Sequence, residues 1–294
     1  MRRWALRVAY LGLGYHGFQR QPNVVTIEGR LLDALHRADV IENKNLKKHR
    51  YAIAARTDSG VSALEQTIAF SSSNTPNLNQ INSYLPNSIC VWAIAEVSDE
   101  FNPKSLCYSK TYEYHHYQGT RKLNLSIMRE SAHLLEGTHN FRNFARYNSK
   151  SDQRFERMLF SVEIVENNPL VLFRFTAKAF LWEQCRRMVG HLLDVGLEKT
   201  SPNEPNGTLY LLSNECEYQV TKPTAVPPDG LLLATTNYEG IHFRSASYSP
   251  LKKIKFLEQL SQDLFRRHQV AEKMRKRISE LRSANLIQNI SQRV

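Results

Sequence analysis

The sequence predicts an α+β fold with two ferredoxin-like (βαββαβ) halves, residues 1–100 and 101–249, and a basic helical extension over residues 250–294. Two observations lead to this prediction. The order strand, helix, strand, strand, helix, strand occurs twice, with a junction near residues 98–104, and such halves form a mixed, mainly antiparallel sheet. After Pro250 the apolar residues take helical spacing and the charge becomes strongly basic. The halves share only the pattern, because no sequence repeat links them.

In the first half, strand and helix signals alternate. β-favouring residues predict strands at residues 4–10, 51–54, 66–71 and 90–97. Apolar residues at helical spacing predict helices at residues 26–40 and 77–85. Thr26 is a suitable cap for the first of these helices, and Pro86 closes the second.

The second half repeats this order. The predicted strands are residues 107–117, 158–165, 170–177 and 231–235, the middle two joined by a turn at Asn167, Asn168 and Pro169. The predicted helices are residues 126–135, stopped by Gly137, and the amphipathic segment 181–195. Residues 203–226 are polar and predict a loop that contains a short helix. The tail, residues 250–293, predicts a long helix with a partial apolar stripe, either continuous or broken in the middle.

The charge of the chain favours a polyanionic partner. The 294 residues carry a net charge of +11, with a pI near 9.5, and nucleic acid is the usual partner of such a protein. Residues 250–294 hold eleven Lys or Arg and four Asp or Glu, so this tail carries +7 of that charge. We therefore expect the tail to contribute affinity for nucleic acid through phosphate contacts rather than to contribute to catalysis. The rival role for its apolar stripe is packing on the core or on a second subunit. A basic surface that serves only solubility is the alternative.

Cysteine spacing and hydropathy exclude several other classes. The four cysteines, Cys90, Cys107, Cys185 and Cys216, form no C-x-x-C pair and lie at no zinc-finger spacing from a histidine. We expect no structural metal and a reducing compartment. No segment approaches the length of a membrane span. Arg7 interrupts the apolar run near the start, which argues against a targeting peptide, so we expect a cytoplasmic protein.

The first candidate site is the segment Ala55-Arg56-Thr57-Asp58-Ser59-Gly60-Val61. Ser59 and Gly60 mark a turn, which places Asp58 on a loop between two predicted strands. Loops on a rigid sheet often hold catalytic groups. The alternative is an aspartate that only caps the turn, with Arg56 as a surface charge.

The second segment, residues 10–22, is rich in glycine and contains G-x-G-x-x-G at Gly12, Gly14 and Gly17. A dinucleotide site would require a helix at the third glycine, but the chain leads into Pro22. Contact with a nucleic acid backbone suits the segment better, and we assign substrate contact to Arg20 and Gln21.

Two further segments complete the set. Strand alternation in Lys110-Thr111-Tyr112-Glu113-Tyr114 places Lys110, Tyr112 and Tyr114 on one face. Basic and aromatic residues on one sheet face resemble a base-stacking platform, and a packed sheet face is the alternative. The helix at residues 181–195 carries Arg186 and Arg187, and a buried arginine there requires a carboxylate. Arg186 is placed to reach Asp58.

Taken in order, these segments resemble the tRNA pseudouridine synthase A (TruA) family from about Arg7 to Asn237. The matching segments are Y-x-G…G-F-Q-R-Q, R-T-D-x-G-V, K-T-Y-E-Y, L-E-G-T-H-N-F…F, F-L-W…R and G-L-L-L. Three positions depart from the usual G-R-T-D-A-G-V-H-A segment of the family. Ala55 replaces its glycine, Ser59 its alanine and Ser62 its histidine.

The resemblance implies a fold with a central basic cleft, a homodimer, and a reaction that converts uridines 38 to 40 in the anticodon arm of tRNA without cofactor or metal. It implies that Asp58 is the nucleophile, that Arg186 lowers its pKa, and that Tyr112 stacks on the base and moves a proton. Arg56 would fill the space that the flipped base leaves. Lys110 would also bind substrate, and Leu231 and Leu233 would wall the pocket. Whether Asp58 attacks C1′ or removes a proton from C2′ stays open.

Two other classes of function were weighed. A tRNA-binding protein without catalysis would share Tyr112 and the basic surface, but it would not need both Asp58 and Arg186. A dinucleotide-dependent oxidoreductase would need a helix after Gly17 and an acidic ribose ligand about 20 residues later, and the sequence offers neither.

Overall fold

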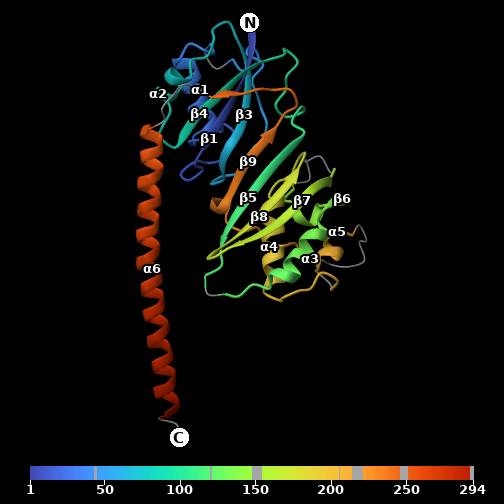
Figure 1. The fold of residues 1–294 in the computed structure, drawn as a ribbon, viewed down its shortest axis with the longest axis vertical. Coiled ribbons are helices and arrows are strands. Elements are labelled where there is room, and N and C mark those ends of the chain that lie inside the picture. The colour runs from blue at the N-terminus through green and yellow to red at the C-terminus, as the bar shows by residue number, and fades with distance from the viewer. Residues whose placement is uncertain are drawn as a thin grey trace. The chain divides into compact units, whose positions relative to one another are not determined.

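The computed structural model describes residues 1–42, 45–119, 121–147, 154–204, 206–213, 221–245 and 251–291. Some residues named in the sequence analysis lie outside these ranges: Cys216, Pro250 and residues 292–294. The chain forms two compact units, Met1–Tyr248 and Ser249–Val294. In the second unit, α6 (Leu251–Ser291) is one continuous helix (Figure 1). No helix of the described part of the chain is both long and apolar enough to cross a membrane.

One sheet runs through the first unit in the order β10-β4-β1-β3-β9-β5-β8-β7-β6, and β2 pairs with β3 (Figure 1). Its strands are β1 (Arg2–Tyr10), β2 (Ala52–Ile53), β3 (Ser62–Ser72), β4 (Ile89–Val97), β5 (Ser109–Tyr117), β6 (Gly137–Asn140), β7 (Glu156–Asn167), β8 (Leu170–Ala177), β9 (Leu231–Asn237) and β10 (Arg244–Ser245). The helices of this unit are α1 (Ile27–Arg37), α2 (Leu78–Tyr84), α3 (Leu125–Leu134), α4 (Gln184–Gly196) and α5 (Thr208–Leu212), with short 3₁₀ turns at Arg142–Phe144 and Pro228–Gly230.

Each half has the ferredoxin-like strand order. The first half is ordered β4-β1-β3-β2, and the second is ordered β9-β5-β8-β7. Among the pairings between described strands only β3–β9 is parallel, and it joins the two halves. The predicted α+β class with a mainly antiparallel sheet and a C-terminal helix is therefore confirmed. The boundary near residue 100 stays a prediction, because both halves lie in one compact unit.

The observed strands differ from the predicted ones mainly in where they begin and end and in the short strands at the edges of the sheet. β3 begins at Ser62, directly after the Asp58 loop, and β2 is reduced to Ala52–Ile53. The edge strands β6 and β10 were not predicted, because four or two residues are too few to show alternation. The cap on α1 is as predicted: the Thr26 side chain accepts a hydrogen bond from the backbone N–H of Gly29.

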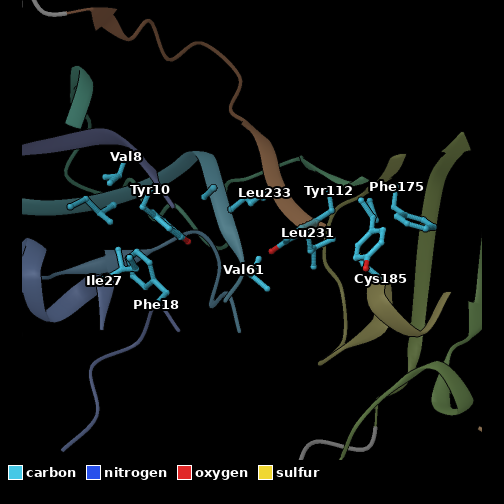
Figure 2. Close-up of a cluster of buried hydrophobic side chains, with 14 of the residues drawn as sticks. Val8, Tyr10, Phe18, Ile27, Val61, Tyr112, Phe175, Cys185, Leu231 and Leu233 are labelled. Carbon is cyan, nitrogen blue, oxygen red and sulfur yellow. The ribbon is translucent and has the colours of Figure 1, made fainter. Parts of the chain in front are cut away.

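Helices and sheet share one apolar core that continues across both halves. Figure 2 shows part of it: Tyr10 and Phe18 of the first half lie toward one end, and Cys185 and Phe175 of the second half lie toward the other. Val61, Leu231 and Leu233 lie between them. The core therefore crosses the junction between the halves at the place where the Asp58 loop enters β3.

A buried arginine braces the same junction. Arg7 donates a hydrogen bond to the hydroxyl of Thr67 on β3 at 3.1 Å, and it donates another to the hydroxyl of Thr236 on β9. The two threonine hydroxyls are themselves hydrogen-bonded at 2.8 Å. Glu65, 3.5 Å from the Arg7 guanidinium, supplies the countercharge that a buried arginine needs. These side chains connect β1, β3 and β9 beyond the short backbone pairing of β3 with β9.

His191 on α4 is a buried polar group of the second half. Its Nε2 shares a hydrogen bond of 2.8 Å with the hydroxyl of Thr208 on α5, which is also hydrogen-bonded to Ser131 on α3. The ring packs edge-on against Phe144 at 5.7 Å. Burial lowers the pKa of His191 to about 4, so the ring is neutral at physiological pH.

This histidine predicts an acid-sensitive contribution to stability. Because its pKa in the folded chain, about 4, lies below the ordinary value of about 6.5, the contribution is complete above pH 6.5 and is lost as the pH falls toward 4. We expect the difference in unfolding free energy between the parent and His191→Gln to fall by about 2 kcal/mol between pH 7.5 and pH 5. Urea denaturation at several pH values measures it, and a difference that does not change with pH would contradict it.

Candidate active site

Asp58 stands on the loop that joins β2 to β3. A turn fixes the loop, because the N–H of Val61 donates to the carbonyl of Asp58 at 3.2 Å and Gly60 has a φ of +82°. The hydroxyl of Thr57 is hydrogen-bonded to the phenol of Tyr10 at 2.7 Å. Thr57 and Val61 thus anchor the loop in the core on the two sides of Asp58, and the Asp58 carboxylate remains about one-quarter exposed.

The glycine-rich segment packs directly on this loop. A Cβ at Gly12 would lie 2.3 Å from the carbonyl oxygen of Val61, and one at Gly17 would lie 3.0 Å from that of Thr57. The N–H of Phe18 also donates to the Thr57 carbonyl, at 3.1 Å. No helix begins at Gly17, because the next helix, α1, begins ten residues later at Ile27. Two of the glycines therefore provide close approach to the Asp58 loop, a role that sequence spacing alone did not indicate, and the dinucleotide alternative fails.

Arg186 of α4 faces Asp58 from the second half. Its Nη1 lies 3.7 Å from the Asp58 carboxylate, and its Nε donates to the carbonyl of Val226 at 2.7 Å. The Val226 N–H in turn donates to the Arg186 carbonyl at 3.2 Å. The predicted approach of Arg186 to Asp58 is therefore present, and the 221–230 segment holds the guanidinium in place.

Glu183 is the residue of this site that the sequence did not reveal. It has a left-handed backbone conformation, with a φ of 62°, directly before α4. Its carboxylate lies 2.7 Å from Arg187, 3.3 Å from Arg146 and 4.0 Å from Arg186. Burial raises its pKa, but the hydrogen bonds from Arg187 and Arg146 outweigh burial, and the pKa is lowered. The only available signal was its place in the quoted F-L-W…R segment.

Burial and charge act in opposite directions on Asp58. Burial is the larger effect and raises its pKa, and the negative charge of Glu183 adds to the rise. Arg186 and the Trp182 side chain lower the pKa but do not reverse the shift. Arg186 therefore lowers the Asp58 pKa as expected, but burial outweighs it and the net pKa is raised. Because of this net rise, the carboxylate loses its charge sooner on acidification than an exposed aspartate would.

Tyr112 lies on β5 opposite the two predicted leucines of β9. Tyr112 pairs with Leu233, and Tyr114, two residues later, pairs with Leu231. All four side chains belong to one buried core cluster, and Figure 2 shows Tyr112 beside Leu231 and Leu233. The Tyr112 ring meets Phe180 edge-on at 5.2 Å and is 8% exposed. Burial raises the pKa of Tyr112 well above its ordinary value, which keeps the hydroxyl protonated.

The predicted contacts of Arg56, Arg20, Gln21 and Lys110 with the substrate divide into two groups. Arg56, Arg20 and Gln21 are exposed, and no hydrogen bond or ion pair joins them to Asp58 within the described part of the chain. Gln21 donates to the carbonyl of His16 at 2.9 Å. Lys110 is buried and donates to the carbonyl of Lys178 at 3.2 Å, and burial lowers its pKa. Its position does not favour the predicted contact with substrate.

Each of the three residues that differ from the family's usual segment, Ser62, Ser59 and Ala55, makes a hydrogen bond outside the loop. The hydroxyl of Ser62 accepts a hydrogen bond from the N–H of Gly12 at 3.0 Å, and Ser59 donates to the carbonyl of Tyr15 at 3.1 Å. The buried side chain of Gln66 pairs with both backbone groups of Ala55, at 3.2 and 2.7 Å. These hydrogen bonds hold the loop against the neighbouring segments.

No group of three or more His, Cys, Asp or Glu side chains in the described ranges is arranged to hold a metal ion.

Comparison with known proteins gives a consistent result. A family model described as "tRNA pseudouridine synthase" matches residues 131–239. The chain is 33% identical to tRNA pseudouridine synthase A of Methanosphaera stadtmanae, over 88% of this chain and 92% of that protein. It is 36% identical to the protein of that name from Thermococcus kodakarensis, over 90% and 92% of the two chains. The chain belongs to the tRNA pseudouridine synthase A family. The predicted family is confirmed, and with it the predicted enzyme class, an isomerase.

The synthase from Pyrococcus furiosus is 37% identical, over 85% of this chain and 89% of its own. A solved structure titled "Crystal Structure of a Cbf5-Nop10-Gar1 Complex" aligns at a TM-score of 0.34 with 15% identity, over 65% of this chain and 45% of that chain. That likeness is too low to bear on function.

The contact between the glycine segment and the Asp58 loop predicts a sharp effect of one methyl group. In Gly12→Ala the new Cβ would meet backbone atoms of Val61 and Gly60 at 2.3–2.6 Å, so the loop must move. We expect pseudouridine formation on tRNA to fall roughly 100-fold, because a displacement of about 1 Å in a reacting group has that effect. Gly14→Ala is the control: it carries the cost of a positive φ, which Gly12→Ala does not, but its Cβ meets no atom within 4 Å. Equal activity losses in the two variants would contradict the prediction.

Proposed function

We propose that this chain converts uridine to pseudouridine at positions 38 to 40 in the anticodon arm of tRNA, with Asp58 as the nucleophile. The pair formed by Asp58 and Arg186, at 3.7 Å, carries the proposal. It joins a partly exposed carboxylate of the first half to a guanidinium of the second, beside the Tyr112 face of the sheet. An RNA-binding protein without catalysis has no use for a carboxylate there, because it would repel phosphate.

The reaction requires the bond between uracil N1 and ribose C1′ to break and a new bond between C5 and C1′ to form. When the Asp58 carboxylate attacks C1′, the base leaves with the electron pair of the N1 bond. After the base has turned, C5 attacks C1′ and the carboxylate departs. The proton of C5 is lost and N1 gains one, so atoms and electrons balance.

Two neighbours support this assignment. Arg186 stabilises the charged form of Asp58 against the rise in pKa that burial causes. Tyr112 keeps its proton because burial raises its pKa, so its hydroxyl has a proton to pass to the detached base. Its ring would stack on that base, with Leu231 and Leu233 forming the adjacent wall of the pocket.

The RNA itself would contact exposed basic groups. We assign Arg56, beside Asp58, to the space that the target base leaves, and Arg20 and Gln21 to the backbone. The basic tail, residues 250–294 with a net charge of +7, would add phosphate contacts whose effect weakens with salt. A homodimer with a basic cleft, working in the cytoplasm, completes the proposal, and these features derive from the family resemblance.

The proposal is tested by Asp58→Asn. Asparagine keeps the shape of the side chain but removes its charge, so we expect tRNA binding close to that of the parent and no detectable pseudouridine. The measurement is product formation in single-turnover mixtures with enzyme in excess, followed by mapping of the modified position. Asp99→Asn, an exposed aspartate after β4, is the matched control and should act as the parent does. Product from Asp58→Asn near the parent rate would place the nucleophile elsewhere.

A second substitution separates the ring of Tyr112 from its hydroxyl. In Tyr112→Phe the ring still stacks, so we expect unchanged affinity for tRNA and a turnover reduced about 100-fold, within the range for loss of a general acid or base. Tyr114→Phe is the matched control, since Tyr114 is equally buried on the same strand face. Should Tyr112→Phe work at the parent rate, the ring is only a platform and the proton moves by another route.

A further inference from the structure

Trp182 is an exposed aromatic residue in direct contact with the Asp58 site. It lies in the turn before α4 and is 47% exposed, whereas Trp4 is buried and Trp92 is partly buried. Its side chain is close enough to the Asp58 carboxylate to lower the pKa of Asp58. An indole that combines contact with a reactive carboxylate and a large open surface is not explained by core packing.

Arg146 is stacked on this indole. Its guanidinium carbon lies 4.4 Å from the centre of the Trp182 ring, and its backbone N–H donates to the Trp182 carbonyl at 2.9 Å. Glu183 orients the guanidinium at 3.3 Å, yet the Arg146 side chain is still 58% exposed. The pair therefore presents a fixed stack of two planar groups to solvent, with a net positive charge at its outer layer.

The exposed aromatic and basic surface continues along the chain from this stack. Tyr147, the next residue, packs on Phe155 at 5.0 Å. The Lys222 ammonium lies 3.9 Å from the centre of the Tyr147 ring, and Arg142 donates to the Tyr147 hydroxyl at 3.3 Å. The cations at this rim fit phosphates, and the exposed rings fit unpaired bases.

We propose that the Arg146–Trp182 stack is a binding platform for an unpaired base next to the target uridine. The inference rests on the proposed function, because it takes RNA as the substrate. Bases stack on aromatic rings and on arginine planes alike, and the stack adjoins Asp58, where a nucleotide neighbouring the target would lie. The platform holds that neighbour while the target base occupies the face of Tyr112. The contact uses the face of a base, so it adds affinity without strict sequence preference.

The test pairs a protein change with an RNA change. The substrate is a tRNA transcript in which the uridine that the parent enzyme converts has been mapped. It is assembled so that the nucleotide on either side of that uridine carries its own base or an abasic ribose. We expect Trp182→Ala to weaken the Kd for intact RNA at least fivefold, the lower end for one stacked base. On the RNA that is abasic at the stacked position, the same substitution should change the Kd less than twofold.

Other variants separate stacking from contact with Asp58. Trp182→Phe keeps a ring but loses the indole N–H, so it should bind intact RNA within about twofold of the parent even if its turnover falls. Arg146→Ala should show the same dependence on the neighbouring base as Trp182→Ala. Phe160→Ala on β7, 45% exposed, is the control and should leave both Kd values unchanged.

The outcomes distinguish the platform from the activity. If Trp182→Ala and Arg146→Ala weaken binding equally for intact RNA and for both abasic RNAs, the platform is overturned although the parent still forms pseudouridine. If the parent converts no uridine, the proposed function fails; the abasic sites are then placed beside uridines 38 to 40 in turn, and the dependence of Kd on the neighbouring base still decides the platform.

Discussion

A very short parallel pairing, between β3 and β9, sets the geometry of the whole site. Only Ser62 with Leu232 and Ala63 with Leu233 are paired, yet this contact brings the loop before β3 beside the strand that pairs with β5. Backbone pairing over so few residues is weak, so side chains complete it. The buried bridge from Arg7 to the threonines of both strands and the apolar core that crosses the junction do this. Asp58 and Tyr112, which belong to different halves, face one site only because this junction holds.

Two carboxylates share Arg186, which lowers the pKa of both, yet their net pKa shifts have opposite directions. Glu183 has three arginines within 4.0 Å, and its pKa is lowered. Asp58 has Arg186 at 3.7 Å, and burial raises its pKa. The charge of Glu183 is thus largely neutralised by fixed partners, while Asp58 keeps a charge that is less well compensated. A carboxylate with few fixed partners is the better nucleophile, since it gives up less in order to attack. The number of nearby arginines therefore distinguishes the two carboxylates: Glu183 is held as a structural ion-pair partner, and Asp58 stays available to react.

Much of this arrangement could be predicted from the sequence, because repeating patterns report on buried faces. Alternation and helical spacing predicted both βαββαβ halves and the shared strand face of Tyr112 and Tyr114. The family resemblance supplied the leucine wall, and the need of a buried arginine for a carboxylate predicted that Arg186 approaches Asp58. The left-handed turn at Glu183 left no pattern, since glutamate rarely adopts that conformation. The packing of Gly12 on the Asp58 loop was also out of reach, because it depends on contacts between segments about 50 residues apart. The direction of the Asp58 pKa shift requires the depth of burial, which spacing does not give.

The order of the strands along the chain has a consequence for synthesis on the ribosome. The loop that carries Asp58 is made early, but β9, which flanks it in the sheet, spans Leu231–Asn237. While the intervening residues are still being added, the edge of β3 beside the loop has no partner, and an unpaired edge invites wrong pairing. The first half consequently completes this edge of its sheet only after nearly all of the second half has been made. A ribosome that stops between Asp58 and β9 leaves a chain that has the reactive aspartate but lacks the strand that completes its site.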